Sequence, residues 1–232
     1  MHHRIFFDGD LGQEEVSITG DELHHAARVV RVHEGEEVEL LDGRGIAVTG
    51  EVVAAGREAI RVRITGPAPS RESPLRIVLA MAIIQLEKFE LVLQKATELG
   101  VAALIPLITE RVEVRPERYR GKADRWEKIV FEAVKQSGRS VMPSLEPPAA
   151  FEDVVRRPGV RLFFDADSAP GDPPSFQTAT LLVGPEGGWA QAEIELAREE
   201  RCVFQRLGPR RLRAETAAIA AAGIIAARYG DI

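Results

Sequence analysis

The stretch that decides the fold is Thr180-Leu181-Leu182-Val183-Gly184-Pro185-Glu186-Gly187-Gly188-Trp189, where an apolar strand passes directly into a loop with three glycines. A helix is expected to follow it. Glycines adopt positive φ and let a ligand come close to the backbone. The loop lacks the Gly-Lys-Ser/Thr ending of a phosphate-binding P-loop, and its spacing differs from the dinucleotide-binding GxGxxG. The local pattern leaves two interpretations open, a ligand-binding loop and a tight strand-to-helix turn.

The sequence on both sides of this stretch alternates between apolar runs and amphipathic segments. Ile77–Ile83 is a near-continuous apolar run, which is typical of a strand buried on both faces. Further strands are expected at Ala102–Leu107, Arg161–Phe164, Thr180–Val183 and Val203–Leu207. Helices are expected where apolar side chains recur at helical spacing, over 89–99, 126–134, 191–200 and 214–228. This alternation predicts an α/β fold with a mainly parallel sheet, in which ligands bind beyond the carboxyl ends of the strands.

A second loop of the same kind follows the last expected strand. It reads Leu207-Gly208-Pro209-Arg210-Arg211-Leu212-Arg213-Ala214-Glu215-Thr216, so three arginines gather where a strand ends. A guanidinium binds phosphate or carboxylate through two parallel hydrogen bonds. The alternative is that these arginines cap carbonyl groups or pair with Glu186, Glu193 or Glu195. For the three together, the pattern favours a ligand site.

The N-terminal part has a different pattern. Short strands are expected at Arg4–Phe7, Glu15–Ile18, Glu37–Leu41, Ile46–Val53 and Ile60–Ile64. Thr19 and Glu22 have capping-box spacing, which predicts a helix over Leu23–Val30. Several strands at short spacing indicate a small β-barrel. The prolines of Gly66–Pro74 predict a semi-rigid extended linker. We therefore expect two domains, at 1–70 and 75–232.

Two groups of polar residues are candidates for contact with the phosphates or bases of a nucleic acid. The first comprises Arg4, His24, Arg28 and Arg31 on the expected barrel, and its alternative is an ordinary solvated face. The second comprises Gln136 and Arg139 at the end of the expected helix 126–134, and its alternative is a plain capped helix end.

Composition narrows the class of protein. The formal net charge of −6 disfavours broad, nonspecific binding of nucleic acid but leaves room for a local basic patch. The single cysteine, Cys202, excludes a disulfide framework and a multi-cysteine metal site, so we expect no metal and a buried core role for this residue. No apolar run is long enough for a membrane helix, and no secretory pattern stands at the N-terminus. A cytoplasmic location without membrane contact is expected.

The two loops together resemble the RsmE family of bacterial 16S ribosomal RNA uridine-N3 methyltransferases. Further matches to this family lie at Gln94–Gly100, Thr109-Glu110-Arg111, Gln136-Ser137-Gly138-Arg139 and, near the N-terminus, His24 or His25 with Val29-Val30-Arg31 and Gly35. The resemblance covers nearly the whole chain. It implies an N-terminal PUA-like RNA-binding barrel, a C-terminal SPOUT-type domain with a trefoil knot, and a homodimer.

The resemblance also implies a pocket for S-adenosylmethionine. One side of this pocket is expected from Leu182, Gly184, Glu186 and Gly188, and the other from Leu207, Gly208, Leu212 and Arg213. This chain departs from the family at two positions. Ala214 stands where members usually have Thr, which removes a hydroxyl near the site, and Ala190 replaces a common Ser at a helix N-cap.

The expected reaction is methylation of N3 of a uridine in 16S ribosomal RNA, within the small ribosomal subunit. The base must be unpaired, because N3 lies on its pairing edge. We hypothesise that Arg213 acts in catalysis by positioning the uridine or its phosphate and stabilising the developing N3 anion. The proton acceptor stays open, since Glu215 is near in sequence but could belong to a structural pair. The alternatives are an enzyme for another nucleotide-like ligand and a noncatalytic RNA-binding ribosome-assembly factor.

Overall fold

The chain is organised in two compact units. The computed structural model describes residues 3–24, 26 and 32–232. The first unit reaches to Glu72 and also takes in Val134–Met142, and the second comprises Ser73–Ala133 and Pro143–Ile232. The segment Val134–Met142, far along the chain from the rest of the first unit, therefore belongs to it. The expected division into residues 1–70 and 75–232 puts this segment in the second domain, whereas its contacts put it in the first unit.

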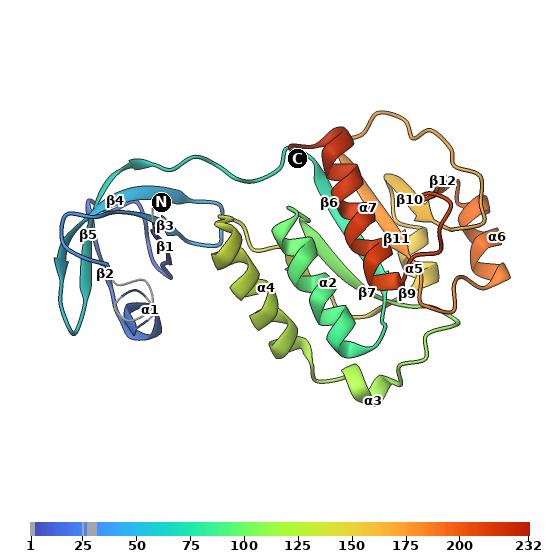
Figure 1. The fold of residues 1–232 in the computed structure, drawn as a ribbon, viewed down its shortest axis with the longest axis horizontal. Coiled ribbons are helices and arrows are strands. Elements are labelled where there is room, and N and C mark those ends of the chain that lie inside the picture. Colours follow the sequence, from blue (N-terminus) through green and yellow to red (C-terminus); the bar gives the residue numbers. More distant parts are fainter. Residues whose placement is uncertain (1–2, 25, 27–31) are drawn as a thin grey trace. The chain divides into compact units, whose positions relative to one another are not determined.

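The first unit is built on a five-stranded sheet in the order β1-β3-β4-β5-β2 (Figure 1). The strands are β1 (His3–Phe6), β2 (Glu15–Ile18), β3 (Glu37–Leu41), β4 (Ala47–Ala55) and β5 (Ile60–Pro67). β1 pairs with β3 in parallel, and the other pairings are antiparallel. Apolar side chains that include Ile5, Val38, Leu40 and Val62 form its core. The five strands expected from the sequence are confirmed, with small shifts at their ends.

Two expectations for the first unit change. Helix α1 spans Gly20–His24, and most of the helix expected over Leu23–Val30 lies outside the described residues. The expected linker begins later than Gly66, because β5 continues through Pro67, which stands opposite Val48 of β4. A proline is accepted at the end of a strand, where its missing N–H interrupts little of the ladder.

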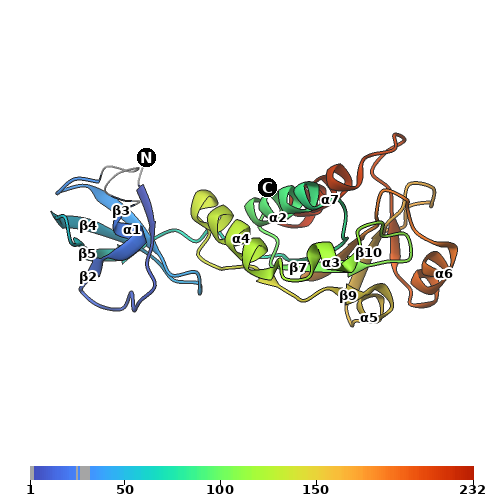
Figure 2. The same cartoon turned by 90° about the horizontal axis from the view of Figure 1, so that it is seen from below.

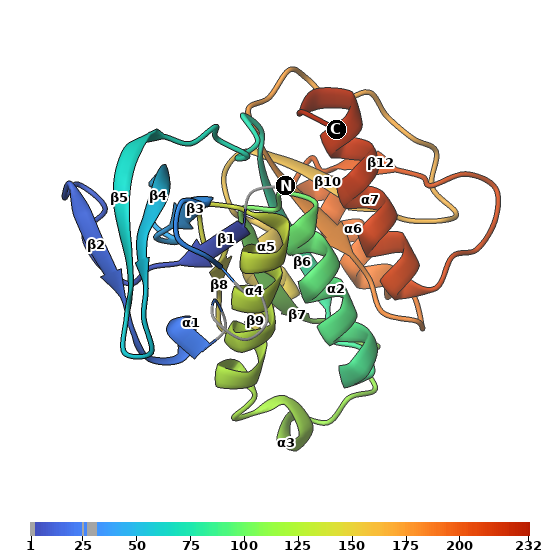
Figure 3. The same ribbon diagram turned by 60° about the vertical axis from the view of Figure 1, so that its left-hand side comes forward.

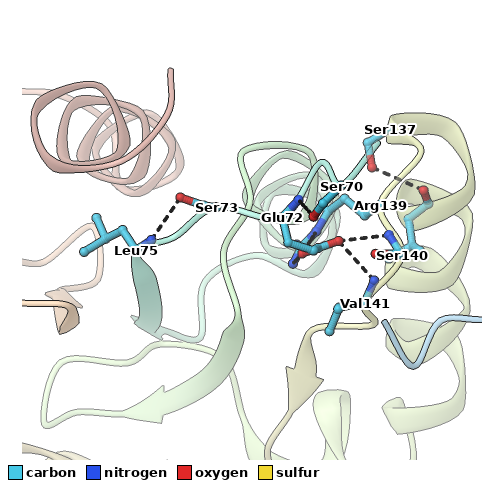
Figure 4. A network of polar contacts seen from close by, with 9 residues as sticks. Ser70, Glu72, Ser73, Leu75, Ser137, Arg139, Ser140 and Val141 are labelled. Atoms are coloured by element: carbon cyan, nitrogen blue, oxygen red, sulfur yellow. Dashed lines mark hydrogen bonds and ion pairs between the residues drawn. The ribbon is translucent and has the colours of Figure 1, made fainter. Parts of the chain in front are cut away.

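The end of the linker is bonded to Val134–Met142 (Figure 4). The carboxylate of Glu72 accepts hydrogen bonds from Arg139 Nη2 at 2.8 Å and from the backbone N–H groups of Ser140 and Val141 at 2.9 and 3.0 Å. Arg139 is only 3% exposed. A buried guanidinium is stable only when it is paired, so this carboxylate fixes the segment within the first unit.

Backbone bonds add to this attachment. The N–H of Met142 donates to the carbonyl of Gly43 at 2.8 Å, and the N–H of Gly45 donates to the carbonyl of Ser140 at 2.9 Å. Arg44 and Val141 form an isolated antiparallel bridge. The segment thus pairs with the turn between β3 and β4.

The second unit is built on a parallel sheet in the order β12-β10-β11-β6-β7-β8, with β9 also paired to β7. The strands are β6 (Arg76–Ala82), β7 (Ala103–Ile108), β8 (Ser144–Leu145), β9 (Ala149–Ala150), β10 (Val160–Phe164), β11 (Thr178–Val183) and β12 (Val203–Gln205). Every pairing in this sheet is parallel. The expected α/β fold with a mainly parallel sheet is confirmed.

Helices cover both faces of this sheet (Figure 2). They are α2 (Leu86–Glu98), α3 (Pro116–Tyr119), α4 (Ala123–Ser137), α5 (Phe151–Val155), α6 (Gln191–Glu199) and α7 (Ala214–Tyr229). α2 and α7 pack side by side on one face, and α7 also contacts β6 and β11 (Figure 3). α5 and α6 pack together on the other face. The short elements α3, α5, β8 and β9 were not expected from the sequence. The knot stays a prediction of the resemblance.

Two further sequence-based expectations concern Cys202 and membrane helices. Cys202 is buried in an apolar cluster with Phe151, Phe163 and Trp189, which confirms its core role. Among the residues that the structure describes, no helix combines the length and the apolar character needed to cross a membrane.

The attachment through Glu72 can be tested by replacing Glu72 with Ala. Because E72A leaves the buried Arg139 without its carboxylate, we expect local destabilisation of about 2–3 kcal/mol. Amide hydrogen exchange should become faster in residues 139–142 and in β3. The control is E15A, which removes an exposed pair with Arg61 and should cost less than about 1 kcal/mol. Unchanged exchange in E72A would contradict the structural role of this carboxylate.

The reactivity of Cys202 gives a second test. Burial raises the pKa of its thiol to about 11, and the nearby Arg161 opposes that shift only in part. Only the thiolate reacts with disulfide reagents, so at pH 8 labelling of the native chain should be about 100-fold slower than labelling of the denatured chain. Equal rates in the two states would show that the thiol is exposed or ionised in the native protein.

Candidate active site

The two loops singled out in the sequence follow strands of the same parallel sheet. The glycine loop, residues 184–188, follows β11, and the arginine loop, residues 206–213, follows β12. β10 lies between these two strands and pairs with both. Because all the strands run in parallel, their carboxyl ends share one edge of the sheet. This edge is where the candidate site lies.

The glycine loop is fixed by the aromatic residue that ends it. The indole of Trp189 is buried against Phe163, with ring centroids 4.4 Å apart, and its Nε1 donates to the carbonyl of Phe164 at 2.9 Å. The indole lies over Gly184, where a Cβ would come within 2.9 Å of the ring. Gly184 is therefore required for close packing, and the loop has both a structural and a ligand-binding interpretation.

The helix after the glycine loop is capped by a carboxylate. Ala190 is the N-cap of α6 and has no side-chain acceptor, so the expected weak cap is present. Glu193 supplies the other half of the capping box, in which the side chain three residues into the helix accepts the N–H of the N-cap residue. One of its oxygens accepts the N–H of Ala190 at 2.8 Å, and the other accepts the N–H of Glu110 at 2.9 Å. Glu193 is thus engaged with the backbone and does not pair with the arginine loop.

A third segment reaches the glycine loop from the end of β7. Arg111 donates from Nη1 to the carbonyl of Gly187 at 3.0 Å, and its neighbour Glu110 is bonded to Glu193. Thr109 is buried, and its hydroxyl has no hydrogen-bond partner among the described residues. Thr109-Glu110-Arg111 was matched to the family in the sequence, but its contact with the glycine loop became visible only in the fold.

The arginine loop presents its cations to solvent. Arg210, Arg211 and Arg213 are exposed, and within 3–24, 26 and 32–232 none of them forms a hydrogen bond or ion pair through its guanidinium. The alternative that they pair with Glu186, Glu193 or Glu195 is therefore wrong for these residues. Arg213 is also the N-cap residue of α7, with extended backbone. Unpaired guanidiniums at the edge of a parallel sheet are suited to an anionic ligand.

A lysine that no sequence motif marks lies between the glycine loop and the start of α7. Lys88 Nζ is 3.8 Å from Glu186 Oε1 and 3.9 Å from Glu215 Oε1. Glu186 belongs to the glycine loop and Glu215 to the first turn of α7. The other oxygen of Glu215 is buried without a hydrogen-bond partner among the described residues. Of the two roles left open for Glu215, the ion pair is present, and the free oxygen keeps the second role open.

The residues predicted to hold the cofactor differ in exposure. Leu182 is fully buried, and its side chain belongs to the apolar core of the second unit. Gly184, Gly188, Leu207 and Leu212 are half-buried, whereas Glu186, Gly208 and Arg213 are exposed. Gly188 and Gly208 have φ values of 70° and 89°, which favour glycine. All these residues belong to the second unit and lie on β11 or in the two loops.

The residues predicted to contact RNA fall into three groups. His24 and Gln136 are exposed, and Arg28 and Arg31 lie outside the described residues. Arg4 and Arg139 have partners inside the first unit, Glu39 and Glu72 respectively. Although burial opposes ionisation of Glu39, hydrogen bonds from Arg71 and Arg4 hold the pKa of its carboxyl below the ordinary value. Arg4 and Arg139 therefore have a structural role in the first unit, which the sequence could not reveal.

Comparison with known families covers both units. Residues 71–226 match the family model described as an RNA methyltransferase domain, and residues 18–65 match that of an RNA methyltransferase PUA domain. The second match lies within the five-stranded sheet and its connections. The first begins at the end of the linker and includes both loops of the candidate site.

Individual relatives agree with the family models. The chain is 31% identical to ribosomal RNA small subunit methyltransferase E of Bacillus subtilis over 226 residues, covering 90% of this chain and 88% of the relative. It is 32% identical to the protein of the same name from Mycobacterium bovis, covering 90% and 84%. The crystal structure of the Neisseria gonorrhoeae protein of that name, bound to S-adenosyl methionine, superposes with a TM-score of 0.85 at 30% identity over the full length of both chains. With this match in sequence and fold across both units, the chain belongs to the ribosomal RNA small subunit methyltransferase E family.

Proposed function

We propose that this protein transfers a methyl group from S-adenosylmethionine to N3 of a uridine in 16S ribosomal RNA. The observation that carries the proposal is the position of the unpaired Arg210, Arg211 and Arg213 at the same edge of the parallel sheet as the glycine loop. Membership of the methyltransferase E family supports the reaction class.

The residues at this edge fit the proposed cofactor. S-adenosylmethionine carries a cationic sulfonium and an ammonium group, together with an adenosine that has an apolar face. Half-buried Leu207 and Leu212 provide apolar surface, and the carboxylates of Glu186 and Glu215 provide negative charge. The buried, unpartnered oxygen of Glu215 is an acceptor for a donor group of a ligand. Gly184, Gly188 and Gly208 complete the proposed set by allowing close approach to the backbone, and the buried Leu182 precedes the glycine loop on β11.

When bound, S-adenosylmethionine supplies a methyl group that is already electrophilic, so the protein needs only to place the nucleophile and exclude water. Arg213 is the proposed residue for this task. Its exposed guanidinium at the start of α7 can hold the uridine or its phosphate. It would also stabilise the negative charge that develops when N3 loses its proton.

The first unit is the proposed RNA-binding part. Its match to the PUA model supports this assignment. Exposed His24 and Gln136 are the described candidates for contact with RNA, while Arg4 and Arg139 contribute by holding the surface in shape. We further propose a homodimer that acts on the small ribosomal subunit in the cytoplasm.

The test is transfer of radiolabelled methyl groups to small subunits and to free 16S RNA from a strain that lacks the modification. We expect N3-methyluridine in digests analysed by mass spectrometry. R213A should lower the rate by roughly 100-fold, the usual cost of losing one group that stabilises transition-state charge. The matched control is R228A, which removes an exposed arginine at the other end of α7 and should leave the rate unchanged.

Two outcomes would contradict the proposal in different ways. Retention of RNA without methyl incorporation would indicate a noncatalytic RNA-binding factor. Full methylation by R213A would leave the proposed reaction standing but show that Arg213 has no part in catalysis. Comparing the two substrates also tells whether free RNA or the assembled subunit is methylated.

A further inference from the structure

Lys88 occupies a position that local helix electrostatics disfavour. It lies in the first turn of α2, two residues after Leu86, where the helix begins. The N-terminal end of a helix carries partial positive charge, so acidic side chains are preferred there and a lysine is unfavourable. A residue that breaks a local rule needs compensation from the tertiary structure, and such positions are frequent in functional sites.

The compensation comes from two carboxylates on different elements. Glu186 Oε1 lies 3.8 Å from Lys88 Nζ, and Glu215 Oε1 lies 3.9 Å from it. The side chain of Lys88 is 28% exposed and that of Glu215 is 13% exposed. Charges that are partly removed from water attract each other more strongly than surface pairs do, because water screens them less.

The sheet topology explains why these three residues meet. α2 follows β6, and the glycine loop with Glu186 follows β11, which is the neighbour of β6 in the sheet. α7 packs against α2 and begins at the same edge with Glu215. Lys88 therefore stands where the glycine loop and the first turn of α7 come together, and one cation balances an acidic group from each.

We propose that Lys88 is a positioning residue that holds the glycine loop and the start of α7 in the geometry required for binding S-adenosylmethionine. This inference rests on the proposed function. Lys88 acts through Glu186 and Glu215 and needs no contact with the reacting atoms. Without its charge the two carboxylates repel each other, and Glu215 keeps a buried oxygen with neither a cation nor a donor nearby.

The proposal predicts a specific pattern of kinetic effects. Loss of Lys88 should weaken cofactor binding, because the two sides of the site lose their common partner. Once cofactor saturates the site, the unpaired Arg213 can still meet the RNA. The Kd and KM for S-adenosylmethionine should therefore rise, while kcat at saturating cofactor changes much less. A general loss of folding would lower the active fraction and leave KM unchanged.

The test uses the full chain with K88M and K88R. Calorimetry with S-adenosylmethionine should give a Kd about tenfold higher for K88M, by analogy with the loss of a group that orients a metal ligand. K88R keeps the charge and should recover most of the affinity. The control is K95M on the same helix, where the lysine pairs with Glu98 three residues away, and its Kd should equal that of the unmodified chain.

A double-mutant cycle keeps the test decisive if K88M folds poorly. Glu186 is exposed, so E186Q should fold, and its effect on Kd should be smaller in a K88Q background, which lacks the charge of Lys88, than in the unmodified chain if the two side chains act together. Additive effects of the substitutions at 88 and 186 would overturn the proposal. So would a Kd for K88M within about twofold of the unmodified value, far from the expected tenfold rise.

The same measurements separate this inference from the proposed function. If the unmodified chain fails to bind S-adenosylmethionine, the proposed cofactor is wrong. If it binds the cofactor and methylates RNA, but K88M does so with unchanged Kd and KM, only the role of Lys88 is wrong.

Discussion

The parallel pairing of β10, β11, β12 and β6 is the constraint on which the candidate site depends. Strands that run in one direction place their carboxyl ends at one edge, so the loops that leave them converge even when they are far apart in sequence. The glycine loop and the arginine loop leave this edge on either side of β10. The first turns of α2 and α7 lie at the same edge, because each of these helices follows a strand that ends there. A single choice of strand direction thus brings together the glycines, the arginines and Lys88.

Bonds from other segments hold the glycine loop at this edge. Trp189 is bonded to the carbonyl of Phe164, Arg111 to that of Gly187, and Glu193 joins the start of α6 to Glu110. The donors and acceptors are distributed over the ends of β7, β10 and β11. Such attachment orders the loop before a ligand arrives, which lowers the entropy cost of binding. The arginine loop is different, because the guanidiniums of Arg210, Arg211 and Arg213 have no partners among the described residues and remain available to an anion.

In the first unit, ion pairs that are largely shielded from water hold separate segments of the chain together. Arg4 and Arg71 share Glu39, and Arg139 is paired with Glu72. Gly138, with φ of 74°, ends α4 and leaves room for Arg4, whose Nε would lie 2.6 Å from an added Cβ. These contacts join residues 134–142 to a sheet formed by the first 70 residues of the chain. Breaking one such pair takes a partner from a carboxylate or guanidinium that is largely shielded from water, which costs more than the pair itself contributes.

The sequence by itself determined the alternation of strands and helices, the two loops and the family, because apolar periodicity and glycine or proline spacing are local properties of the chain. Ile77–Ile83 and Thr180–Val183 were recognised as buried strands without knowledge of their partners. Only the tertiary structure decided which charges are paired. Arg139 and Arg4 look like candidates for RNA contact in the sequence but have internal partners 67 and 35 residues away. Lys88 has no motif of its own, and its partners Glu186 and Glu215 come from the other end of the chain. Ion pairs depend on distance in space, and sequence patterns report only distance along the chain.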